Sequence, residues 1–354
     1  MAYSCGKPFA HTSGPRDARV VIVGEAWGEQ EDIVGKPFIG ASGQELTRML
    51  TEAGIQRNTC LLTNTVAFRP IDNKVESLCV QKKDLPADYP LPPLGNGKYL
   101  AQEYLGEISR LRDELSAYPR NLCIALGATA AWALLGSSRI SAVRGTTTEA
   151  SLLPGLKVLP TFHPAAVLRN WSQRVIVVAD LLKAAREAEF PEIRRPERWV
   201  LIRPSLDEIR RWIDQWAKSA VALAVDIETL RGQITHFGIA ASRSRAVVIP
   251  FVDLSQPSGS YWPTHEAECH AWAMVQELLS LPAPKIFQNG LYDLQYLLRM
   301  GLSPNNVLHD TMLLHHSMYP ELQKGLGFLG SIYTNEASWK LLREHADEMT
   351  KRDD

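Results

Sequence analysis

The stretch RVVIVGEAWGEQED, residues 19–32, decides the fold of the first half of the chain. It opens with a short apolar run that ends at Gly24, a pattern typical of a strand buried on both faces of a parallel sheet. Similar runs recur at residues 60–64, 121–127 and 156–163, with helical patterns between them. This alternation predicts an α/β/α domain, in which helices cover both faces of a parallel sheet.

Length and composition describe a globular chain with more than one domain. At roughly 150 residues per domain, the 354 residues predict two domains. Hydrophobic residues make up 45% of the chain and charged residues 22%, and five scattered cysteines without a CxxC motif predict free, buried thiols. No apolar run reaches the ~18 residues of a membrane helix, and the N-terminus lacks a signal-peptide core, so we expect a cytoplasmic protein without a membrane partner.

A break between the two halves is predicted at residues 190–198. This segment, FPEIRRPER, has two prolines and a charge cluster and is typical of a linker. Residues 1–189 then form the first domain, with an irregular insertion rich in proline and lysine at 72–98. Strand and helix patterns restart after the linker, so residues 199–354 are predicted to form a second α/β domain with a mixed sheet.

Side chains able to hold a planar ring follow three of the predicted strands. A strand end with closely spaced glycines lets the backbone approach a ligand, and ligands bind at this edge of a parallel sheet. An amide can donate and accept along one edge, and a phenyl ring on a glycine-flanked loop can stack. The candidates are Glu25, Phe38, Asn64 and His163.

Leu168 and Arg169 follow His163 and form an apolar wedge and a cation suited to a DNA minor groove. Each of these features alone has an ordinary structural explanation. Glycines after a strand are usually turns, and a histidine before proline is more often a loop residue. The order in which the features occur favours a binding site.

Four motifs in this order resemble those of the family-4 uracil-DNA glycosylases. GEAWGEQED resembles that family's GEAPGxxED, GKPFIGASG its GxPFVGxxG, LLTNTVAFRP its TNxVKCRP, and LPTFHPAAVLRN its HPSxLLR. The resemblance covers residues 18–187. It implies a glycosylase fold that acts on DNA by extruding a base from the stack.

The resemblance also implies roles for single residues. His163 would stabilise negative charge that develops on a uracil oxygen, and Glu31 would place the water or support the sugar cation. Phe38 would stack on the flipped-out base, and Asn64 would hydrogen-bond its edge. The base pocket would be lined by Glu25, Ala26, Phe38 and Asn64.

The chain departs from the family pattern at two places. Trp27 stands where the family has proline, at the edge of the expected pocket. The iron–sulfur cysteines are reduced to Cys5, since Phe68 replaces one of them and another is missing near Ala101. Because such a cluster needs four thiolates, we predict no iron–sulfur cluster. A pocket that recognises a base but is slow or inactive is therefore an open alternative.

The second half carries paired carboxylates in VALAVDIETL and FQNGLYDLQYL. Asp226 and Glu228 are two apart, so on a strand they point to the same face. Asp293 opens a helix further on, with Asn289 and Tyr292 beside it. Carboxylates gathered at a strand end suit Mg²⁺ or Mn²⁺.

These motifs resemble the 3′–5′ proofreading exonuclease domain of family-A DNA polymerases, over residues 198–340. The resemblance implies an RNase H-like fold in which Asp226, Glu228 and Asp293 hold two metal ions. The ions would activate water and stabilise the leaving 3′-oxygen. Asn289 and Tyr292 would then contact the DNA.

The fourth carboxylate of such a site is missing from the sequence. No Tyr-x3-Asp or His-x4-Asp element follows Asp293. We interpret Asp310 as the N-cap of a helix and His315 and His316 as packing or surface residues. Hydrolysis from the 3′ end by this chain alone is therefore expected to be weak or absent.

Both halves indicate DNA replication or repair, and their fusion resembles phage family-A polymerases. The leading hypothesis is the N-terminal portion, or a separate subunit, of such a polymerase, located in the host cytoplasm. Its partners would be DNA and a polymerase chain in cis or in trans. Two alternatives stay open, a non-catalytic DNA-binding and polymerase-assembly module and a free-standing repair glycosylase that excises uracil.

Overall fold

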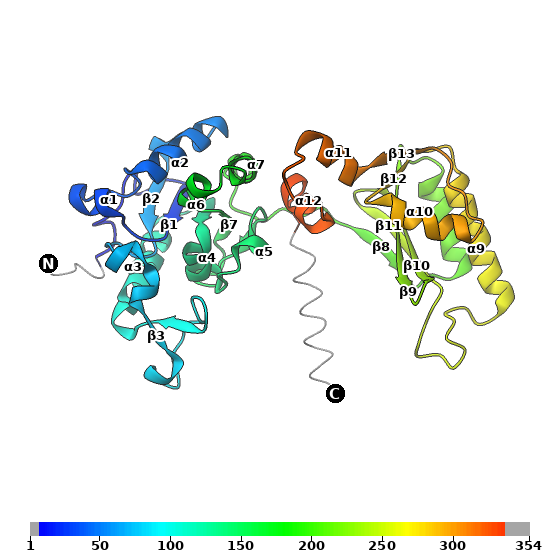
Figure 1. The fold of residues 1–354 in the computed structure, drawn as a ribbon, viewed down its shortest axis with the longest axis horizontal. Helices are drawn as coiled ribbons and strands as arrows, with labels where there is room; N and C mark the ends of the chain where they lie inside the picture. The colour runs from blue at the N-terminus through cyan, green and yellow to red at the C-terminus, as the bar shows by residue number, and fades with distance from the viewer. Residues whose placement is uncertain (1–6, 337–354) are drawn as a thin grey trace. The chain divides into compact units, whose positions relative to one another are not determined.

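The computed structural model describes residues 7–336, which form two compact units (Figure 1). The first unit comprises residues 7–194 and 327–336, and the second comprises 195–326. The sequence predicts one second domain from 199 to 354. The structure instead places its last described segment with the first unit.

Buried polar contacts hold this last segment on the first unit. The Lys183 ammonium donates hydrogen bonds to the carbonyl oxygens of Gly145 (2.8 Å), Thr334 (2.6 Å) and Ser331. A buried ammonium is costly without acceptors, and the returning segment supplies two of the three. Residues more than 140 positions apart therefore share one polar cluster.

The first unit contains a five-stranded sheet in the order β2-β1-β5-β7-β6. Its four longer strands run parallel, which confirms the predicted parallel sheet, and β6 pairs antiparallel at the edge. The strands are β1 (Val20–Gly24), β2 (Leu61–Asn64), β5 (Leu122–Leu126), β6 (Thr148–Glu149) and β7 (Lys157–Thr161).

Helices cover both faces of this sheet, as Figure 1 shows. Alternate strand residues feed two cores, with α3 and α4 on one face and α2 and α7 on the other. The α2 helix begins after Gly40, which is its N-cap residue. The helices are α1 (Glu29–Val34), α2 (Ala41–Glu52), α3 (Leu105–Ser116), α4 (Gly127–Leu135), α5 (Ile140–Val143), α6 (Pro164–Arg169), α7 (Gln173–Glu187) and α12 (Leu326–Tyr333).

The insertion at 72–98 is more regular than its composition predicts. It contains β3 (Cys79–Gln81), which pairs antiparallel with β4 (Lys98–Leu100). Leu78, Leu94 and Leu100 are buried in the adjoining core, and this burial anchors the two strands.

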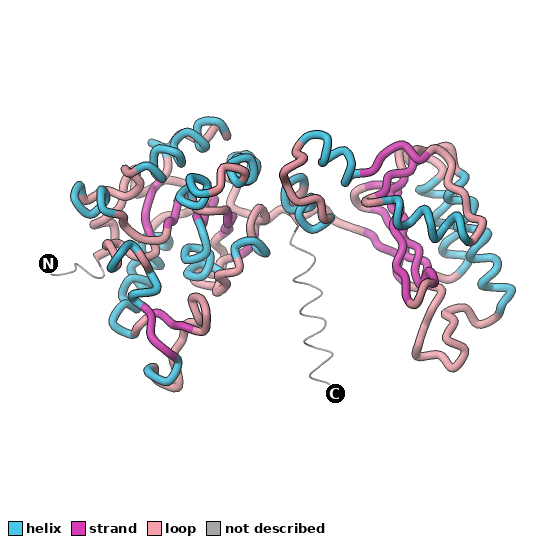
Figure 2. Tube along the Cα trace, viewed as in Figure 1, coloured by secondary structure: helices cyan, strands magenta, loops and turns pink. Residues whose placement is uncertain are grey.

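The second unit contains a six-stranded sheet in the order β13-β12-β9-β10-β11-β8, with its strands drawn in magenta in Figure 2. β9, β10 and β11 are antiparallel, whereas the other pairs are parallel, so the predicted mixed sheet is confirmed. The strands are β8 (Trp199–Ile202), β9 (Leu223–Leu230), β10 (Gln233–Ser242), β11 (Arg245–Pro250), β12 (Lys285–Phe287) and β13 (Val307–Asp310).

Helices of the second unit follow the predicted segments. α8 (Leu206–Trp212) continues into a π-helical turn at Ile213–Ala217, and α9, α10 and α11 span His265–Ser280, Gly290–Arg299 and Thr311–Met318. Over the described part of the chain, no helix is both long enough and apolar enough to cross a membrane.

A buried arginine joins α3 to the end of β2. The Arg110 guanidinium forms ion pairs with Glu107 (3.1 Å) and Glu114 (2.8 Å) on its own helix. It also donates to the carbonyl oxygens of Asn64 (2.6 Å) and Thr65 (3.1 Å). The side chain is 1% exposed, so these contacts are shielded from water. They fix the backbone at the carboxyl end of β2.

Replacement of Arg110 is expected to destabilise the first unit. Arg110→Met leaves Glu107 and Glu114 buried without their cation, so the free energy of unfolding should fall by about 3–5 kcal/mol. Urea denaturation measures the loss. Arg112→Met, on the exposed side of the same helix, should change the value by less than about 0.5 kcal/mol. Equal effects of the two substitutions would contradict the role of the buried ion pairs.

Candidate functional site

The site in the first unit begins where β1 ends, at Gly24. The parallel pairing of β1 and β2 sets Gly24 beside Asn64. A Cβ atom at Gly24 would lie 2.2 Å from Oδ1 of Asn64 and 2.5 Å from Cζ of Phe38. Because glycine has no side chain, the Asn64 amide and the Phe38 ring can both occupy this space at the end of β1.

Asn64 has a fixed backbone and a free side chain. Its carbonyl oxygen accepts the hydrogen bond from Arg110, whereas within residues 7–336 its amide group has no hydrogen-bond partner. The residue is 3% exposed. A buried amide without partners is costly, and a planar ligand with a donor and an acceptor on one edge would satisfy it.

Phe38 is held in a strained conformation by its neighbours. It is buried and has a φ of 58°, in the left-handed region that side chains disfavour. The Arg57 guanidinium donates to its carbonyl oxygen (2.7 Å) and to that of Gly43 (2.9 Å). A Cβ atom at Gly43 would lie 2.0 Å from the Phe38 oxygen, so only glycine permits this turn. Strain kept in place by surrounding contacts is characteristic of functional sites.

Glu31 supports the same loop from its other side. Its Oε1 atom accepts hydrogen bonds from the backbone amides of Ile39 (3.0 Å) and Gly40 (2.9 Å). Its Oε2 atom receives no hydrogen bond from the described residues. The carboxylate thus has a structural role that the sequence did not predict, and one oxygen left for a ligand or water.

His163 is a neutral hydrogen-bond donor. It caps α6, where its Nδ1 accepts from the backbone amide of Ala165 (3.1 Å), so the ring proton sits on Nε2. Burial and the nearby Arg169 cation lower the pKa of His163 to about 4, although Glu31 opposes the shift. The ring stacks near Phe38, with 6.3 Å between centroids and 27° between planes.

Glu25 and Trp27 lie next to this cluster. The Thr129 hydroxyl donates to Glu25 (2.6 Å), and burial raises the pKa of that carboxyl group. Ala26 packs against the core next to α3 and α4. Trp27 is 6% exposed, and its ring lies perpendicular to that of His11 at 4.9 Å, so it packs inward.

Three exposed residues follow His163 along the chain. Leu168 and Arg169, predicted to contact DNA, are exposed on α6. Trp171, which the sequence did not single out, is 61% exposed and lies under the Arg174 guanidinium at 5.4 Å. This edge offers apolar and cationic groups to a ligand that reaches His163.

Arg57, Arg110 and Thr129 support the site and were not predicted from the sequence. Each acts across a long sequence separation, for example 104 residues between Thr129 and Glu25. No local motif marks them. Their types are ordinary for a helix or a turn, and only the fold assigns their partners.

The described cysteines do not fit an iron–sulfur cluster. Cys60, Cys79, Cys123 and Cys269 are free thiols, of which the first and third are buried and the last is exposed. The Phe68 ring packs on Tyr104 with 5.7 Å between centroids. Between residues 7 and 336 no three His, Cys, Asp or Glu side chains form a metal-binding group. Cys5 lies outside the described residues, and the absence of a cluster stays a prediction.

The carboxylates of the second unit meet on β9 and α10. Asp226 and Glu228 share the exposed face of β9, as the two-residue spacing predicts. Asp293, 4% exposed in the first turn of α10, accepts from the backbone amide of Ile227 (3.0 Å). Desolvation and the charge of Glu228 raise the pKa of Asp226. Burial and the charge of Asp226 raise the pKa of Asp293 to about 6.

The neighbouring residues of this group have structural partners. Asp310 caps α11, because its carboxylate accepts from the backbone amides of Met312 (2.8 Å) and Leu313 (3.3 Å), which confirms its N-cap role. It also accepts from the amides of Asn289 (3.1 Å) and Gly290 (2.7 Å) at the start of α10. Asn289 itself adopts a φ of 56° before α10. The Tyr292 hydroxyl lies 2.6 Å from that of Thr229 on β9. The predicted packing roles hold, with His315 buried and His316 exposed.

Like-charge repulsion at this site is what a cation would relieve, yet the carboxylates do not assemble into a metal centre. Asp226, Glu228 and Asp293 form no metal-binding group, and none is found elsewhere in the described residues. By themselves they do not fit the two-metal site that the resemblance implies. No catalytic step is assigned to them.

Removing the Asp293 charge is expected to stabilise the second unit at high pH only. Its folded pKa of about 6 lies above the ordinary value, so the ionised group destabilises the fold above that pH. Asp293→Asn should therefore raise the free energy of unfolding by about 1–2 kcal/mol at pH near 8. The gain should vanish near pH 4. Asp207→Asn, an exposed change on α8, is the control, and a gain that does not depend on pH would contradict the account.

Comparisons with known proteins agree with the geometry of the first unit. The model of the uracil DNA glycosylase superfamily matches residues 11–189. The chain is 34% identical over 173 residues to the type-4 uracil-DNA glycosylase of Thermotoga maritima, covering 48% of this chain and 78% of that protein. It is 35% identical over 158 residues to that of Pyrobaculum aerophilum, covering 43% and 68%.

Among solved structures, Escherichia coli RNase D, an exoribonuclease involved in structured RNA processing, is similar at 16% identity and a TM-score of 0.29. The match covers 40% of this chain and 34% of that one. The superfamily match spans half of the chain and includes every candidate residue of the first unit. The chain belongs to the uracil DNA glycosylase superfamily.

Proposed function

We propose that the first unit removes uracil from DNA by hydrolysing the bond between the base and its sugar. The observation that carries this proposal is the neutral His163, whose ring stacks near that of Phe38, while Phe38 and the Asn64 amide meet at Gly24. The reaction needs three things, and each group supplies one of them. Phe38 offers a ring on which the base can stack, Asn64 can hydrogen-bond the edge of the base, and His163 can donate a hydrogen bond to the oxygen on which negative charge develops. The type-4 glycosylases named above support it.

The reaction begins with extrusion of the base from the DNA stack. The uracil ring stacks on Phe38, the Asn64 Oδ1 accepts from N3–H, and the amide nitrogen donates to O4. When the bond between N1 and C1′ breaks, its electron pair moves into the base and negative charge gathers on O2. The His163 Nε2–H donates to that oxygen and lowers the barrier.

Water completes the reaction at the sugar. The oxygen of water bonds to C1′, and its proton leaves to a basic group, giving an abasic sugar and a uracil anion, which then takes up a proton from that group or from water. The free Oε2 of Glu31 is the group we assign to this water. Leu168 and Arg169 on α6 would fill the gap left by the extruded base.

Replacing His163 is expected to abolish most of the activity. His163→Ala should lower uracil release from a uracil-containing oligonucleotide by about 10²–10³-fold, because one donor to the developing charge is lost. Alkaline cleavage of the labelled product measures release, and a chelator should leave the parent rate unchanged. His316→Ala, an exposed histidine of the second unit, is the matched control. A His163→Ala protein as active as the parent would overturn the mechanism.

The pH profile gives a separate test of the His163 proton. With a pKa of about 4, the ring stays neutral through the range where ordinary histidines titrate. Single-turnover release should therefore show no inflection near pH 6.5 and should change only near about pH 4. An inflection between pH 6 and 7 that disappears in His163→Asn would contradict the neutral-donor assignment.

For the second unit we propose an incomplete proofreading exonuclease that associates with a family-A polymerase chain, in cis or in trans, of the phage type. The DIET and NGLYD motifs support this assignment, together with the repulsion between Asp226 and Asp293. A non-catalytic assembly module is the second candidate, because the three carboxylates do not form a metal-binding group.

The two candidates for the second unit differ in a nuclease assay. The chain alone, given Mg²⁺ or Mn²⁺, should shorten a 5′-labelled single strand weakly or not at all, and Asp226→Ala should change little. Addition of a family-A polymerase chain that carries the missing Tyr-x3-Asp or His-x4-Asp element but has no active exonuclease of its own should restore shortening if the unit is an incomplete nuclease. Strong metal-dependent shortening by the chain alone, lost in Asp226→Ala, would show that the site is complete.

A further inference from the structure

The second unit contains a cavity of about 690 Å³ whose lining includes none of Asp226, Glu228 and Asp293. We call it the Trp199 cavity, and its aromatic and cationic lining consists of Arg198, Trp199, Arg211, Trp212, Trp216 and Arg245. Strand β8, which forms one wall, is separated from β9 by β11 and β10. Three interstrand steps put about 14 Å between them, so the cavity is distinct from the Asp226 site.

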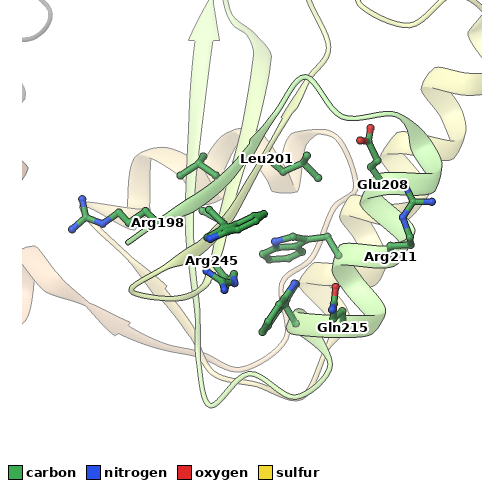
Figure 3. Close-up of a pocket in the computed structure, with 11 residues that line it drawn as sticks. Arg198, Leu201, Glu208, Arg211, Gln215 and Arg245 are labelled. Carbon is green, nitrogen blue, oxygen red and sulfur yellow. The ribbon is translucent and has the colours of Figure 1, made fainter. Parts of the chain in front are cut away.

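The walls of the Trp199 cavity come from three elements. Figure 3 shows Arg198 on the side of β8, Arg245 at the adjoining strand, and Glu208, Arg211 and Gln215 on the side of α8 and the π-helical turn. The turn at Ile213–Ala217 carries Gln215 and Trp216 into the lining. Single π-helical turns are rare and often occur at functional sites.

Indole rings and a cation define the chemistry of the cavity. Trp199 pairs across the strands with Arg245, whose guanidinium lies 5.4 Å from the Trp199 ring and 4.8 Å from the Trp216 ring. Trp199 is 64% exposed although it stands in a strand. An exposed indole backed by a guanidinium offers a flat, open face on which another ring can stack.

Charge in the lining favours an anionic ligand. Three arginines face one carboxylate, Glu208, and that group accepts hydrogen bonds from the backbone and hydroxyl of Ser205 at the start of α8. Its partners and the nearby Arg211 lower the pKa of Glu208, so it serves the helix cap. The lining therefore has an excess of positive charge next to aromatic faces, the combination that binds single-stranded nucleic acid.

We propose that the Trp199 cavity binds single-stranded DNA, with a base stacked on Trp199 and backbone phosphates near the arginines. This site would hold a strand on the second unit at a place other than the Asp226 site. It does not depend on turnover at that site or at the base site. The contact is sequence-tolerant, because every base has a face that can stack.

Photocrosslinking and binding of oligothymidylate to the full chain test the proposal, with a chelator present. An oligothymidylate that contains 4-thiothymidine should crosslink to residues 199–202 or 213–217. Trp199→Ala should remove this crosslink and weaken binding, measured by fluorescence anisotropy, by about tenfold. Trp199→Phe, which keeps a ring, should retain most of both signals.

Ile202→Ala is the matched control, because Ile202 is 66% exposed on the same strand and does not line the cavity. It should behave as the parent protein does, and the thermal midpoints of all variants should agree. Because the first unit is itself proposed to bind DNA, the position of the crosslink decides the outcome. Crosslinks confined to the first unit, or a Trp199→Ala protein that crosslinks like the parent, would overturn the proposal. Tighter binding of oligoriboadenylate than of oligodeoxyadenylate, which compares RNA with DNA without offering uracil to the first unit, would overturn the assignment to DNA.

Discussion

The site of the first unit depends on the absence of a side chain at residue 24. A Cβ atom there would collide with both Asn64 and Phe38, so these two groups can approach only around a glycine. Three charged residues then fix the surroundings from outside: Arg110 holds the backbone of β2, Arg57 the carbonyl of Phe38, and Glu31 the amides that follow it. The amide and the ring are placed by contacts that do not use their own functional atoms. Those atoms stay free for a ligand.

Some ionisable groups near the two candidate sites differ in whether an opposite charge compensates them. In the first unit, Arg110 is paired with two glutamates, and the lowered pKa of His163 keeps its ring neutral. In the second, Asp226 and Asp293 face each other without a compensating cation, and both pKa values are raised. The first arrangement therefore leaves neither Arg110 nor His163 with an uncompensated charge. The second is costly as it stands, which is why we assign it to an incomplete site.

Local patterns predicted the parts of the fold that depend on local physics. The apolar runs ending at Gly24 and Asn64, the same-face spacing of Asp226 and Glu228, and the N-cap at Asp310 all follow from strand and helix geometry. Contacts between residues far apart in the sequence could not be predicted, because no local sequence pattern indicates them. Examples are Arg57 on the Phe38 loop and the return of residues 327–336 to Lys183, which depend on the packing of whole elements. The prolines at 72–98 likewise favoured the prediction of an irregular loop, whereas the structure has a pair of strands there that is anchored by buried leucines.

We propose that one uracil-binding site is formed by Phe38, Asn64 and His163. Nuclear magnetic resonance of the Asn64 side-chain amide and the His163 Nε2–H during titration with free uracil tests it most directly. The account predicts that uracil shifts both signals, that thymine shifts them much less, and that Gly24→Ala abolishes the response because its methyl group displaces Asn64 and Phe38. Signals that do not move with uracil, or that move equally in Gly24→Ala, would contradict it.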